Sequence, residues 1–414
     1  MKRRLIIGSS VSGIIVILML LALVLYPTTP AQRLAIDTYA TEESVDSLSD
    51  AINQFAFSLY SQLSRESEDN LFISPYSIFV ALAMTYEGAK GQTAQEMYDI
   101  LGVPQNNETM LCSFGRIYNL LNQKKEYTLN TANALWTQND YTFLDEYLEF
   151  INNYYMGKAT DVDFGDAEQA ARIINEWVEK NTGGKIKDLI SSGDIDPLTK
   201  LILTNAIYFK GTWKYQFNPD DTNNADFEIT PGSTVSIPMM SLSESDYDFK
   251  YYETEEMQML ELPYKGDKLS MIIILPTEND IVSFENSFTY ENFLAWKEQC
   301  AETSVQIGLP KFTMETEYNL KESFIDMGMT TPFSMDADFS GMNGNQDLFI
   351  EKIKHKAYIK VNEEGTEAAA ATSVHMTLKS APGISFYADH PFLYLIHHTE
   401  TDTILFMGKV MNPS

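Results

Sequence analysis

The spacing of apolar residues along the chain predicts which segments form helices and which form strands. Apolar residues that recur at intervals of three or four predict an amphipathic first helix, and they are Leu48, Ile52, Phe55, Leu59 and Leu63. Residues 167–184 are also amphipathic and end in two glycines, which commonly stop a helix. A T-x-x-E pattern at Thr93 and Glu96 predicts the start of another helix, and Gly102 predicts its end.

Other segments have the pattern of strands. Residues 348–361 alternate between apolar and polar positions, and the apolar face would carry Ile353, His355, Ala357, Ile359 and Val361. Residues 200–213 and 269–276 are apolar along most of their length, which is typical of buried strands. Two further apolar strands are predicted at 390–398 and 403–410. Strands and helices do not alternate regularly, so the sequence predicts an α+β fold with large, mainly antiparallel sheets.

The start of the chain is typical of a targeting segment. Residues 2–4 are basic, and residues 14–26 form an unbroken apolar run that suits the core of a signal peptide. The longer stretch 5–26 is interrupted only by small residues and is long enough to cross a bilayer. Residues 1–31 are therefore expected to be a signal peptide or a signal-anchor, with membrane anchoring through residues 5–26 in the second case. Both alternatives place the rest of the chain outside the cell.

The rest of the chain divides into two parts by composition. Residues 32–47 are polar and acidic and are expected to be a linker, followed by one domain over residues 48–414. The formal net charge of the chain is −29, and loss of residues 1–31, which hold three basic and no acidic residues, would bring it to −32. Such a charge repels phosphate groups, so no nucleic-acid partner is expected.

The chain lacks the sequence signatures of the common enzymes and cofactor sites. There is no G-x-S-x-G, no H-E-x-x-H, no Walker loop and no G-x-G-x-x-G after a strand. His397 and His398 are adjacent, so on a strand they would point to opposite faces, which is poor geometry for a metal. Cys112 and Cys300 either pair or stay free thiols, and the sequence leaves both open. We expect no metal, no cofactor and no enzymatic activity.

Several stretches, in order along the chain, resemble the serpin family of serine protease inhibitors. They read NLFISPYSIFVALAMTYEGAKGQTAQEM, LTNAIYFKGTW, LELPYKG, LPKF, DFSGM, HKAYIKVNEEGTEAAAAT and FYADHPFLYLI. The likeness runs from about Leu48 to the C-terminus. It implies the serpin fold, with three β-sheets, about eight or nine helices and an exposed reactive-centre loop. It also implies that a protease attacks this loop and is trapped as an acyl-enzyme when the freed arm inserts into the main sheet.

The resemblance implies a hinge at the start of the loop, and the residues there suit insertion. The hinge comprises Glu363, Glu364, Gly365, Thr366, Glu367, Ala368, Ala369, Ala370, Ala371 and Thr372. From Thr366 onward every second residue is small or apolar, so one face of an inserted strand would fit a packed sheet. Gly365 tolerates the unusual backbone angles that a hinge needs. No charge blocks the inward positions, which favours an inhibitory member of the family.

The family's spacing places the reactive bond between Lys379 and Ser380. Lysine suits a specificity pocket with a buried acid, so the resemblance implies a trypsin-like serine protease as the covalent partner. Leu378 is the alternative bait residue and would favour a chymotrypsin-like target. The likeness also implies two structural sites, a shutter of Ser74, Ser77, Asn205 and His355 and a breach at Trp213. We expect the protein to be a monomer.

Three other functions stay open at this point. The chain could be a non-inhibitory serpin that acts as a binding or carrier protein, which the alanine-rich hinge disfavours. It could inhibit a cysteine protease, since a lysine bait does not exclude one. A hydrolase is the third alternative, and the missing catalytic motifs argue against it.

Overall fold

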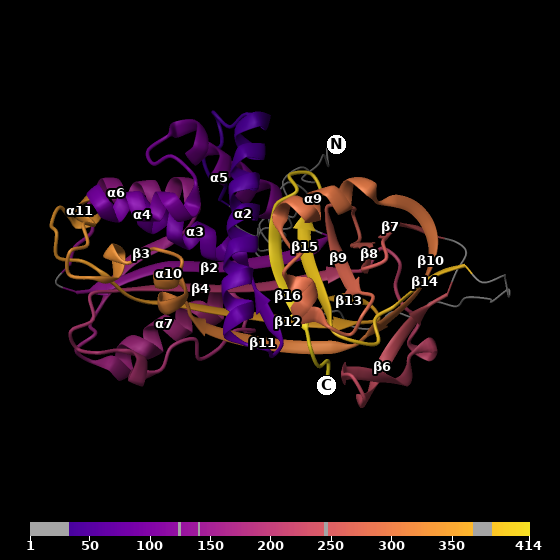
Figure 1. Cartoon of the computed structure of the whole chain (residues 1–414). Coiled ribbons are helices and arrows are strands. Elements are labelled where there is room, and N and C mark those ends of the chain that lie inside the picture. The colour runs from indigo at the N-terminus through magenta and orange to yellow at the C-terminus, as the bar shows by residue number, and fades with distance from the viewer. Residues whose placement is uncertain (1–32, 123–125, 140, 244–246, 367–382) are drawn as a thin grey trace, which may run out of the picture. The chain divides into compact units, whose positions relative to one another are not determined.

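The computed structural model describes residues 33–122, 126–139, 141–243, 247–366 and 383–414 (Figure 1). The predicted targeting segment, the hinge from Glu367 to Thr372, and Leu378, Lys379 and Ser380 lie outside the described residues. No helix within the described ranges is long and apolar enough to cross a membrane.

One sheet has six strands and contains the strand predicted at 348–361. Its order is β11-β12-β13-β4-β2-β3, with β12 parallel to β4, β2 parallel to β3 and the other pairs antiparallel. The strands are β11 (Phe312–Asn319), β12 (Ile350–Asn362), β13 (Gly365–Thr366), β4 (Leu201–Thr212), β2 (Tyr127–Gln138) and β3 (Lys158–Val162). The five residues predicted for the apolar face of β12 are all buried.

A second sheet has ten strands. Its order is β1-β16-β15-β9-β8-β7-β10-β6-β5, and β14 pairs with β10. The strands are β1 (Leu71–Ile73), β16 (Ile404–Val410), β15 (Phe392–His398), β9 (Leu269–Pro276), β8 (Met257–Pro263), β7 (Asp248–Glu253), β10 (Ala301–Pro310), β6 (Ser233–Leu242), β5 (Asn223–Thr230) and β14 (Ile384–Tyr387). β10 pairs with β7 at its start and with β6 at its end, so two of the three expected sheets share this strand and form one continuous sheet.

The described residues contain ten α-helices, slightly more than the eight or nine expected. They are α2 (Glu42–Glu66), α3 (Pro75–Tyr86), α4 (Gly91–Leu101), α5 (Glu108–Asn122), α6 (Asp145–Phe150), α7 (Ala167–Asn181), α8 (Ile281–Glu285), α9 (Tyr290–Gln299), α10 (Lys321–Asp326) and α11 (Ser340–Asn343). The amphipathic helices predicted from residues 48 and 167 are confirmed as α2 and α7.

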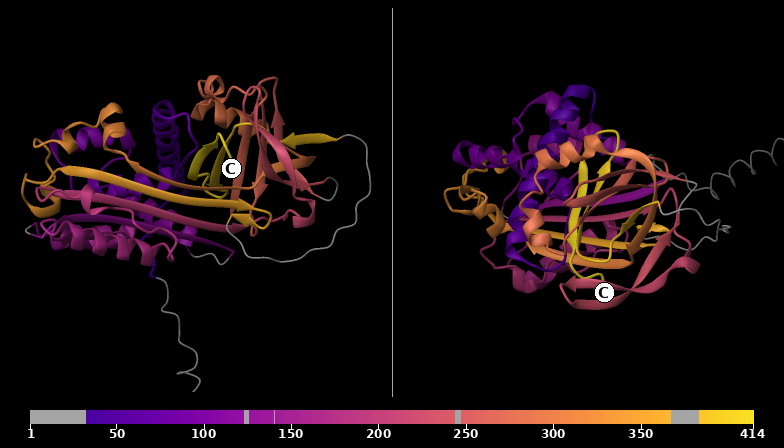
Figure 2. Two further views of the ribbon diagram at one scale, coloured as in Figure 1. Left: turned by 90° about the horizontal axis from the view of Figure 1, so that it is seen from below. Right: turned by 45° about the vertical axis from the view of Figure 1, so that its right-hand side comes forward.

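The helices cover both faces of the six-stranded sheet (Figure 2, left). α3 is buried along its whole length, because it contacts β2 and β4 on one side and β16 of the other sheet on the other. α7 packs on β2 through a separate small apolar cluster that includes Trp136, Ile174 and Val178. The main core therefore lies between the two sheets, and a smaller one lies under α7.

The first helix begins earlier than the sequence predicts. Helix α2 begins at Glu42 with Thr41 as its N-cap, so residues 42–47 of the expected linker 32–47 are helical. Ala35 is buried, and its backbone amide donates to Oδ1 of Asn119 at 3.0 Å. The polar composition of 32–47 suggested a linker, because the first turn of α2 is acidic and faces solvent. Acidic residues are also favourable at a helix N-terminus, so the same composition is compatible with a helix.

The predicted capping box at Thr93 and Glu96 is wrong. Helix α4 already begins at Gly91, and its N-cap residue Lys90 makes no side-chain cap. The Thr93 hydroxyl instead accepts the amide of Asp338, and Glu96 accepts the amides of Thr330 and Thr331. Both side chains therefore accept hydrogen bonds from the backbone of a distant loop instead of capping their own helix. The predicted end of this helix at Gly102 is confirmed, where φ is 67°.

The two cysteines do not form a disulfide. Cys112 is fully buried and Cys300 is partly exposed, and both are free thiols. This settles the alternative that the sequence left open.

Candidate functional site

The six-stranded sheet is open at one end, and the start of the expected hinge already lies in the opening. β12 and β4 pair directly from Ile350 to Tyr358 and from Leu201 to Tyr208. Beyond that point β13 lies between them and is antiparallel to both. Thr366 is opposite Val361 of β12 and Gly211 of β4, and the next pairs involve Gly365. The chain thus leaves β12, turns back and enters the seam between β12 and β4.

Glycine is required at position 365 for two reasons. Its φ of 150° lies where L side chains are rarely found. A Cβ atom there would also lie 2.0 Å from the carbonyl oxygen of Gly211 and 2.7 Å from Cα of Thr212. Both are backbone atoms of β4 and cannot be moved without breaking the pairing. Gly365 therefore allows β13 to turn into the seam at close range.

Thr366 is the first hinge residue whose side chain enters the core. It is 0 % exposed, and its hydroxyl lies 2.7 Å from that of Tyr264, which follows β8. The ring of Tyr264 stacks on Trp213 with 4.5 Å between the centroids. Burial raises the pKa of Tyr264 far above its ordinary value, so its hydroxyl stays protonated. This site therefore accommodates a small side chain that carries a hydroxyl group.

The indole and backbone of Trp213 hold the turn between β12 and β13. The indole nitrogen donates to the carbonyl of Asn362 at 3.0 Å, and the backbone amide of Trp213 donates to the carbonyl of Glu364 at 2.8 Å. The side chain of Asn362 accepts the amides of Glu364 and Gly365. The predicted breach residue therefore contacts the predicted hinge directly.

Glu363 also holds the turn between β12 and β13, through hydrogen bonds of its side chain. Its carboxylate accepts from Nζ of Lys311 and from the hydroxyl of Thr222, both at 2.9 Å. Burial of Glu363 raises its pKa, but these hydrogen bonds outweigh burial and lower the pKa below its ordinary value. The residue is thus held as a carboxylate between the ends of β5 and β11.

The four predicted shutter residues are brought together below β13, at one level of the sheet. His355 of β12 is opposite Asn205 of β4, and Asn205 is opposite Asn133 of β2. Ser74 and Ser77 approach this row from the first turn of α3, where Ser74 is the N-cap. The Ser77 hydroxyl lies 3.0 Å from Oδ1 of Asn133 and also receives the Asn205 amide group. The hydrogen bond between His355 and Asn205 crosses the seam between β12 and β4.

The hydrogen bonds of His355 define which of its ring nitrogens carries the proton. The backbone amide of Ser74 donates to Nε2 at 3.1 Å, so Nε2 holds a lone pair. Nδ1 must then carry the hydrogen and donate to Oδ1 of Asn205. Burial lowers the pKa of His355 to about 3, against 6.5 ordinarily, so the ring stays neutral in the folded protein.

This neutral histidine predicts a loss of stability in acid. The unfolded chain takes up a proton at His355 below pH 6.5 and the folded protein does not until about pH 3, so stability falls as the pH is lowered through this window. Between pH 7 and pH 5 the loss from this group is about 2 kcal/mol. Urea unfolding at both pH values, compared with the same measurement on His355→Gln, isolates it. An equal loss in both proteins would contradict the assignment.

Some important residues of this region were not singled out from the sequence. Tyr264, Asn133 and Lys311 each contact a predicted hinge or shutter residue. Asn133 had a usable signal, because it lies on the buried face of an apolar strand. Tyr264 and Lys311 lie in the quoted stretches LELPYKG and LPKF, but their partners are distant along the chain.

Comparisons with known proteins agree on one family. The sequence model described as "Serpin (serine protease inhibitor)" matches residues 50–413. An uncharacterized serpin-like protein of Thermococcus kodakarensis is 42 % identical over 398 residues, which cover 94 % of this chain and 90 % of the relative. The chain belongs to the serpin family, and the α+β serpin fold expected from the sequence is confirmed.

Solved serpin structures match the fold over nearly their full length. Serpin48 of the insect Tenebrio molitor, described as a highly specific serpin, superposes with a TM-score of 0.82 at 31 % identity, covering 89 % of this chain and 98 % of its own. Human thyroxine-binding globulin in complex with thyroxine gives a TM-score of 0.82 at 30 % identity, covering 90 % and 100 %. The family implies a serpin-type function and no catalytic activity, and this second structure shows that the fold also serves a thyroxine-binding protein.

Proposed function

We propose that this protein inhibits a trypsin-like serine protease by covalent trapping, with its reactive loop inserting into the six-stranded sheet. The observation that carries this proposal is β13, because the first two residues of the insertion are already paired between β12 and β4. Thr366 is fully buried there, and beneath it β12 pairs directly with β4. Insertion would lengthen a strand that already exists.

The register of β13 supports the proposal, because it fixes where the inserted residues would lie. β13 is antiparallel to both neighbours, so each step along the loop moves one residue back on β12 and on β4. Six steps after Thr366, Thr372 would lie opposite His355 and Asn205. The hydroxyl of Thr372 can both donate and accept, so it could replace the hydrogen bond that His355 and Asn205 now share.

The residues between these two threonines also suit their expected neighbours. In this register Ala368 and Ala370 face the core, and small residues fit there without displacing packed side chains. Glu367 would lie on the outer face between Lys210 and Lys360, and a carboxylate between two lysines is a favourable cross-strand arrangement. The alternation seen in the sequence therefore agrees with the two strands that would flank it.

The proposed chemistry occurs at the bond between Lys379 and Ser380. The serine oxygen of the protease attacks the carbonyl carbon of Lys379, and the bond to the nitrogen of Ser380 breaks. That nitrogen takes up a proton and leaves as a new amino terminus, and an ester joins Lys379 to the protease. Insertion of the freed arm then has to precede hydrolysis of this ester.

Incubation with trypsin tests the proposal. The expected result is a complex that survives denaturing electrophoresis, together with a released C-terminal peptide that begins at Ser380 by mass spectrometry. A stable complex with chymotrypsin instead, together with a released peptide that begins at Lys379, would identify Leu378 as the bait residue. Trypsin whose active-site serine is blocked should give neither product. Cleavage before Ser380 without any stable complex would make the protein a substrate and contradict the proposal.

A carrier function is the alternative that the fold allows, since human thyroxine-binding globulin shares it. That function would require a ligand site and no productive insertion, and it predicts cleavage without trapping. We also infer export of the domain, on the basis of the basic start and the apolar run at residues 14–26. Mass spectrometry of the protein from the culture medium, and from membranes, would distinguish a cleaved signal peptide from an anchor.

A further inference from the structure

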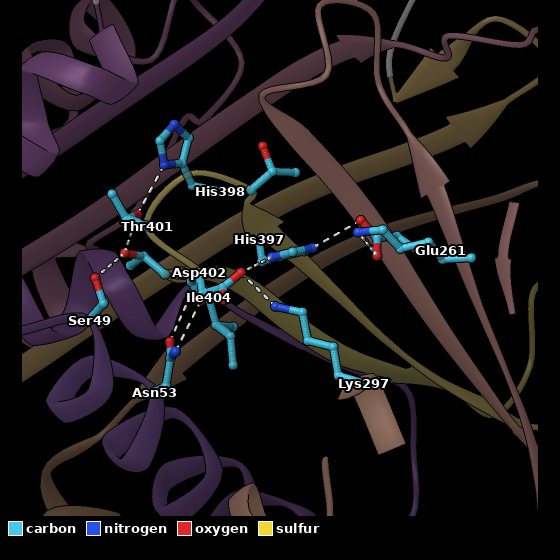
Figure 3. Close-up of polar contacts among 12 residues, drawn as sticks. Ser49, Asn53, Glu261, Lys297, His397, His398, Thr401, Asp402 and Ile404 are labelled. Atoms are coloured by element: carbon cyan, nitrogen blue, oxygen red, sulfur yellow. Dashed lines mark hydrogen bonds and ion pairs between the residues drawn. The ribbon is translucent and has the colours of Figure 1, made fainter. Parts of the chain in front are cut away.

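Three carboxylates are buried among the described residues, and two of them have a lysine partner. The three are Glu87, Glu261 and Glu363. Oε2 of Glu261 lies 3.2 Å from Nζ of Lys250, and its Oε1 lies 3.5 Å from Nε2 of His397 (Figure 3). Glu363 is paired with Lys311 at 2.9 Å. Glu87 differs from both, because it forms no ion pair with a lysine, arginine or histidine of the described ranges.

Glu87 is the C-cap residue of α3, and each of its carboxylate oxygens accepts one hydrogen bond. The residue is 8 % exposed. Oε2 accepts the backbone amide of Asn106 at 3.1 Å, and Oε1 accepts the hydroxyl of Tyr155 at 3.2 Å. A carboxylate offers about four acceptor positions, so these two bonds leave room for a further donor. Both donors are neutral groups, and the negative charge therefore has no balancing charge in the core.

Glu87 lies on the wall of a cavity of about 250 Å³. The cavity is formed by the end of α3, the start of α4, the loop before α5, and α6. Its other lining residues are Lys90, Asn106, Leu144, Glu146, Tyr147, Phe150 and Gly341. Tyr147 is buried, whereas Lys90, Leu144 and Glu146 are exposed. The cavity thus has a buried carboxylate on its wall and a rim at the protein surface.

We propose that this cavity binds a small alkylammonium ion, whose charged end donates hydrogen bonds to Glu87 and whose apolar stem lies against the aromatic and apolar side chains of the lining. An ammonium group has three N–H donors and no acceptor, so it matches a carboxylate with open acceptor positions. The faces of aromatic rings, here those of Tyr147 and Phe150, also attract a cation. A buried charge needs a partner, and the ligand would supply what a lysine supplies at the other two buried carboxylates.

Lys90 on the rim does not take this role. Its side chain is exposed, and it forms no ion pair with Glu87. Burial raises the pKa of Glu87 to about 7, and the amide of Asn106, the hydroxyl of Tyr155 and the charge of Lys90 offset only part of this rise. The negative charge of Glu87 therefore remains poorly balanced when the cavity is empty.

The other titratable groups around Glu87 stay neutral or lie on the rim. They are Tyr86 of α3, Tyr147 and Glu146 of α6, Tyr155, and Lys90. Burial, and then the charge of Glu87, raise the pKa of all three tyrosines, so their hydroxyls keep their protons near neutral pH. Glu146 is exposed at the mouth of the cavity, where a second carboxylate favours entry of a cation.

The charge of Glu87 also determines how binding depends on pH. The alkylammonium pairs with the ionised carboxylate, so protonation of Glu87 competes with binding. The apparent affinity should therefore rise with pH until Glu87 is fully ionised, and then stay constant. Because the pKa of Glu87 is about 7, we expect the affinity to be at least about tenfold higher at pH 8 than at pH 5.5.

Titration with n-butylammonium, followed by NMR of the backbone amides of Asn106 and Gly341, tests the proposal. Both residues line the cavity, and the amide of Asn106 is bonded to Glu87 itself. The neutral analogue n-butanol has the same shape, and sodium chloride at equal concentration controls for ionic strength. We expect saturable shifts of both signals with the amine at pH 8 alone among these three additions. Equal shifts with the alcohol or the salt, or an affinity that does not change with pH, would overturn the proposal.

A lysine side chain of a peptide carries the same ammonium group as a free alkylamine. Nα-acetyl-lysine amide, titrated in the same way, distinguishes these two sources. Its binding would assign the cavity to a lysine side chain of a peptide. Binding of n-butylammonium without binding of this larger amine would assign the cavity to a free amine.

Glu87→Gln is the variant that isolates the charge. It removes the charge and keeps an acceptor oxygen for the amide of Asn106. Binding of n-butylammonium at pH 8 should weaken at least about tenfold, because hydrogen bonds to charged groups are the stronger ones. Unchanged affinity of this variant would refute the site.

Glu149→Gln is the matched control. Glu149 is an exposed residue of α6 and lies outside the set of residues that line the cavity. This variant should bind n-butylammonium as the wild-type protein does, and an equal loss in both variants would mean that only general charge attraction is measured, which contradicts a site at Glu87. If Glu87→Gln folds poorly, the comparison of pH 5.5 with pH 8 on the unmodified protein decides. None of these results depends on whether the protein inhibits a protease.

Discussion

Replacing Thr366 by arginine should convert the protein from an inhibitor into a substrate. Thr366 is fully buried and its hydroxyl contacts that of Tyr264, so an arginine there would place an unpaired charge in the core or expel β13 from the seam. Slower insertion leaves the acyl-enzyme time to hydrolyse. Each 1.4 kcal/mol added to the insertion barrier shifts this competition about tenfold toward cleavage. We therefore expect the SDS-stable complex with trypsin to fall at least about tenfold, while cleavage continues.

The same substitution two residues earlier is the control. Glu364 is half-exposed, so Glu364→Arg adds the same side chain without placing it in the core. Thr366→Ser keeps the hydroxyl that contacts Tyr264. Both variants should retain most of the complex. An undiminished yield of complex with Thr366→Arg would refute the proposed insertion at this seam.

Replacing His355 by alanine should make the sheet open more easily. The change removes the acceptor of the Ser74 amide and the donor to Asn205, and each buried polar group left without a partner costs about 1–3 kcal/mol. The hydrogen bonds lost are among those that close the seam below β13, so the cost falls on the closed form. We expect the Tm to fall by several degrees, and spontaneous loop insertion or polymers to appear on warming.

His398→Ala is the control for a buried histidine in another place. His398 is also fully buried, but it lies on β15 in the ten-stranded sheet. Its loss should lower the Tm without promoting polymers, as judged by native electrophoresis and size-exclusion chromatography after warming. Unchanged melting of His355→Ala with no polymers would count against the shutter. If both variants formed polymers, a general loss of stability would be sufficient to cause polymerisation, and the shutter would have no special role.

The local elements could be predicted because their signals are local. The apolar face of β12, the glycine end of α4 and the amphipathic helix α7 each follow from spacing within a few residues. The capping box at Thr93 failed for the opposite reason. A side chain that could cap its own helix was used by the loop at Asp338, far along the chain. Sequence spacing does not say which of two partners a hydroxyl will meet.

The candidate site was predictable to a similar degree. The resemblance pointed to His355, Asn205, Ser74 and Ser77, but not to Asn133, which completes their hydrogen bonds. Tyr264 and Lys311 were not singled out either, because their partners Thr366 and Glu363 lie far along the chain.

By itself the sequence determined that the hinge could become a strand, because its small residues alternate and no charge faces inward. The sequence explained the glycine at position 365 only by the conformational freedom that a hinge needs, and not by its close approach to the backbone of β4. The tertiary structure decided that the strand has already begun, since only three-dimensional pairing places Gly365 and Thr366 between β12 and β4. The physical reason is that hydrogen-bond register and close backbone approach arise between segments far apart in the chain, and no local pattern encodes them.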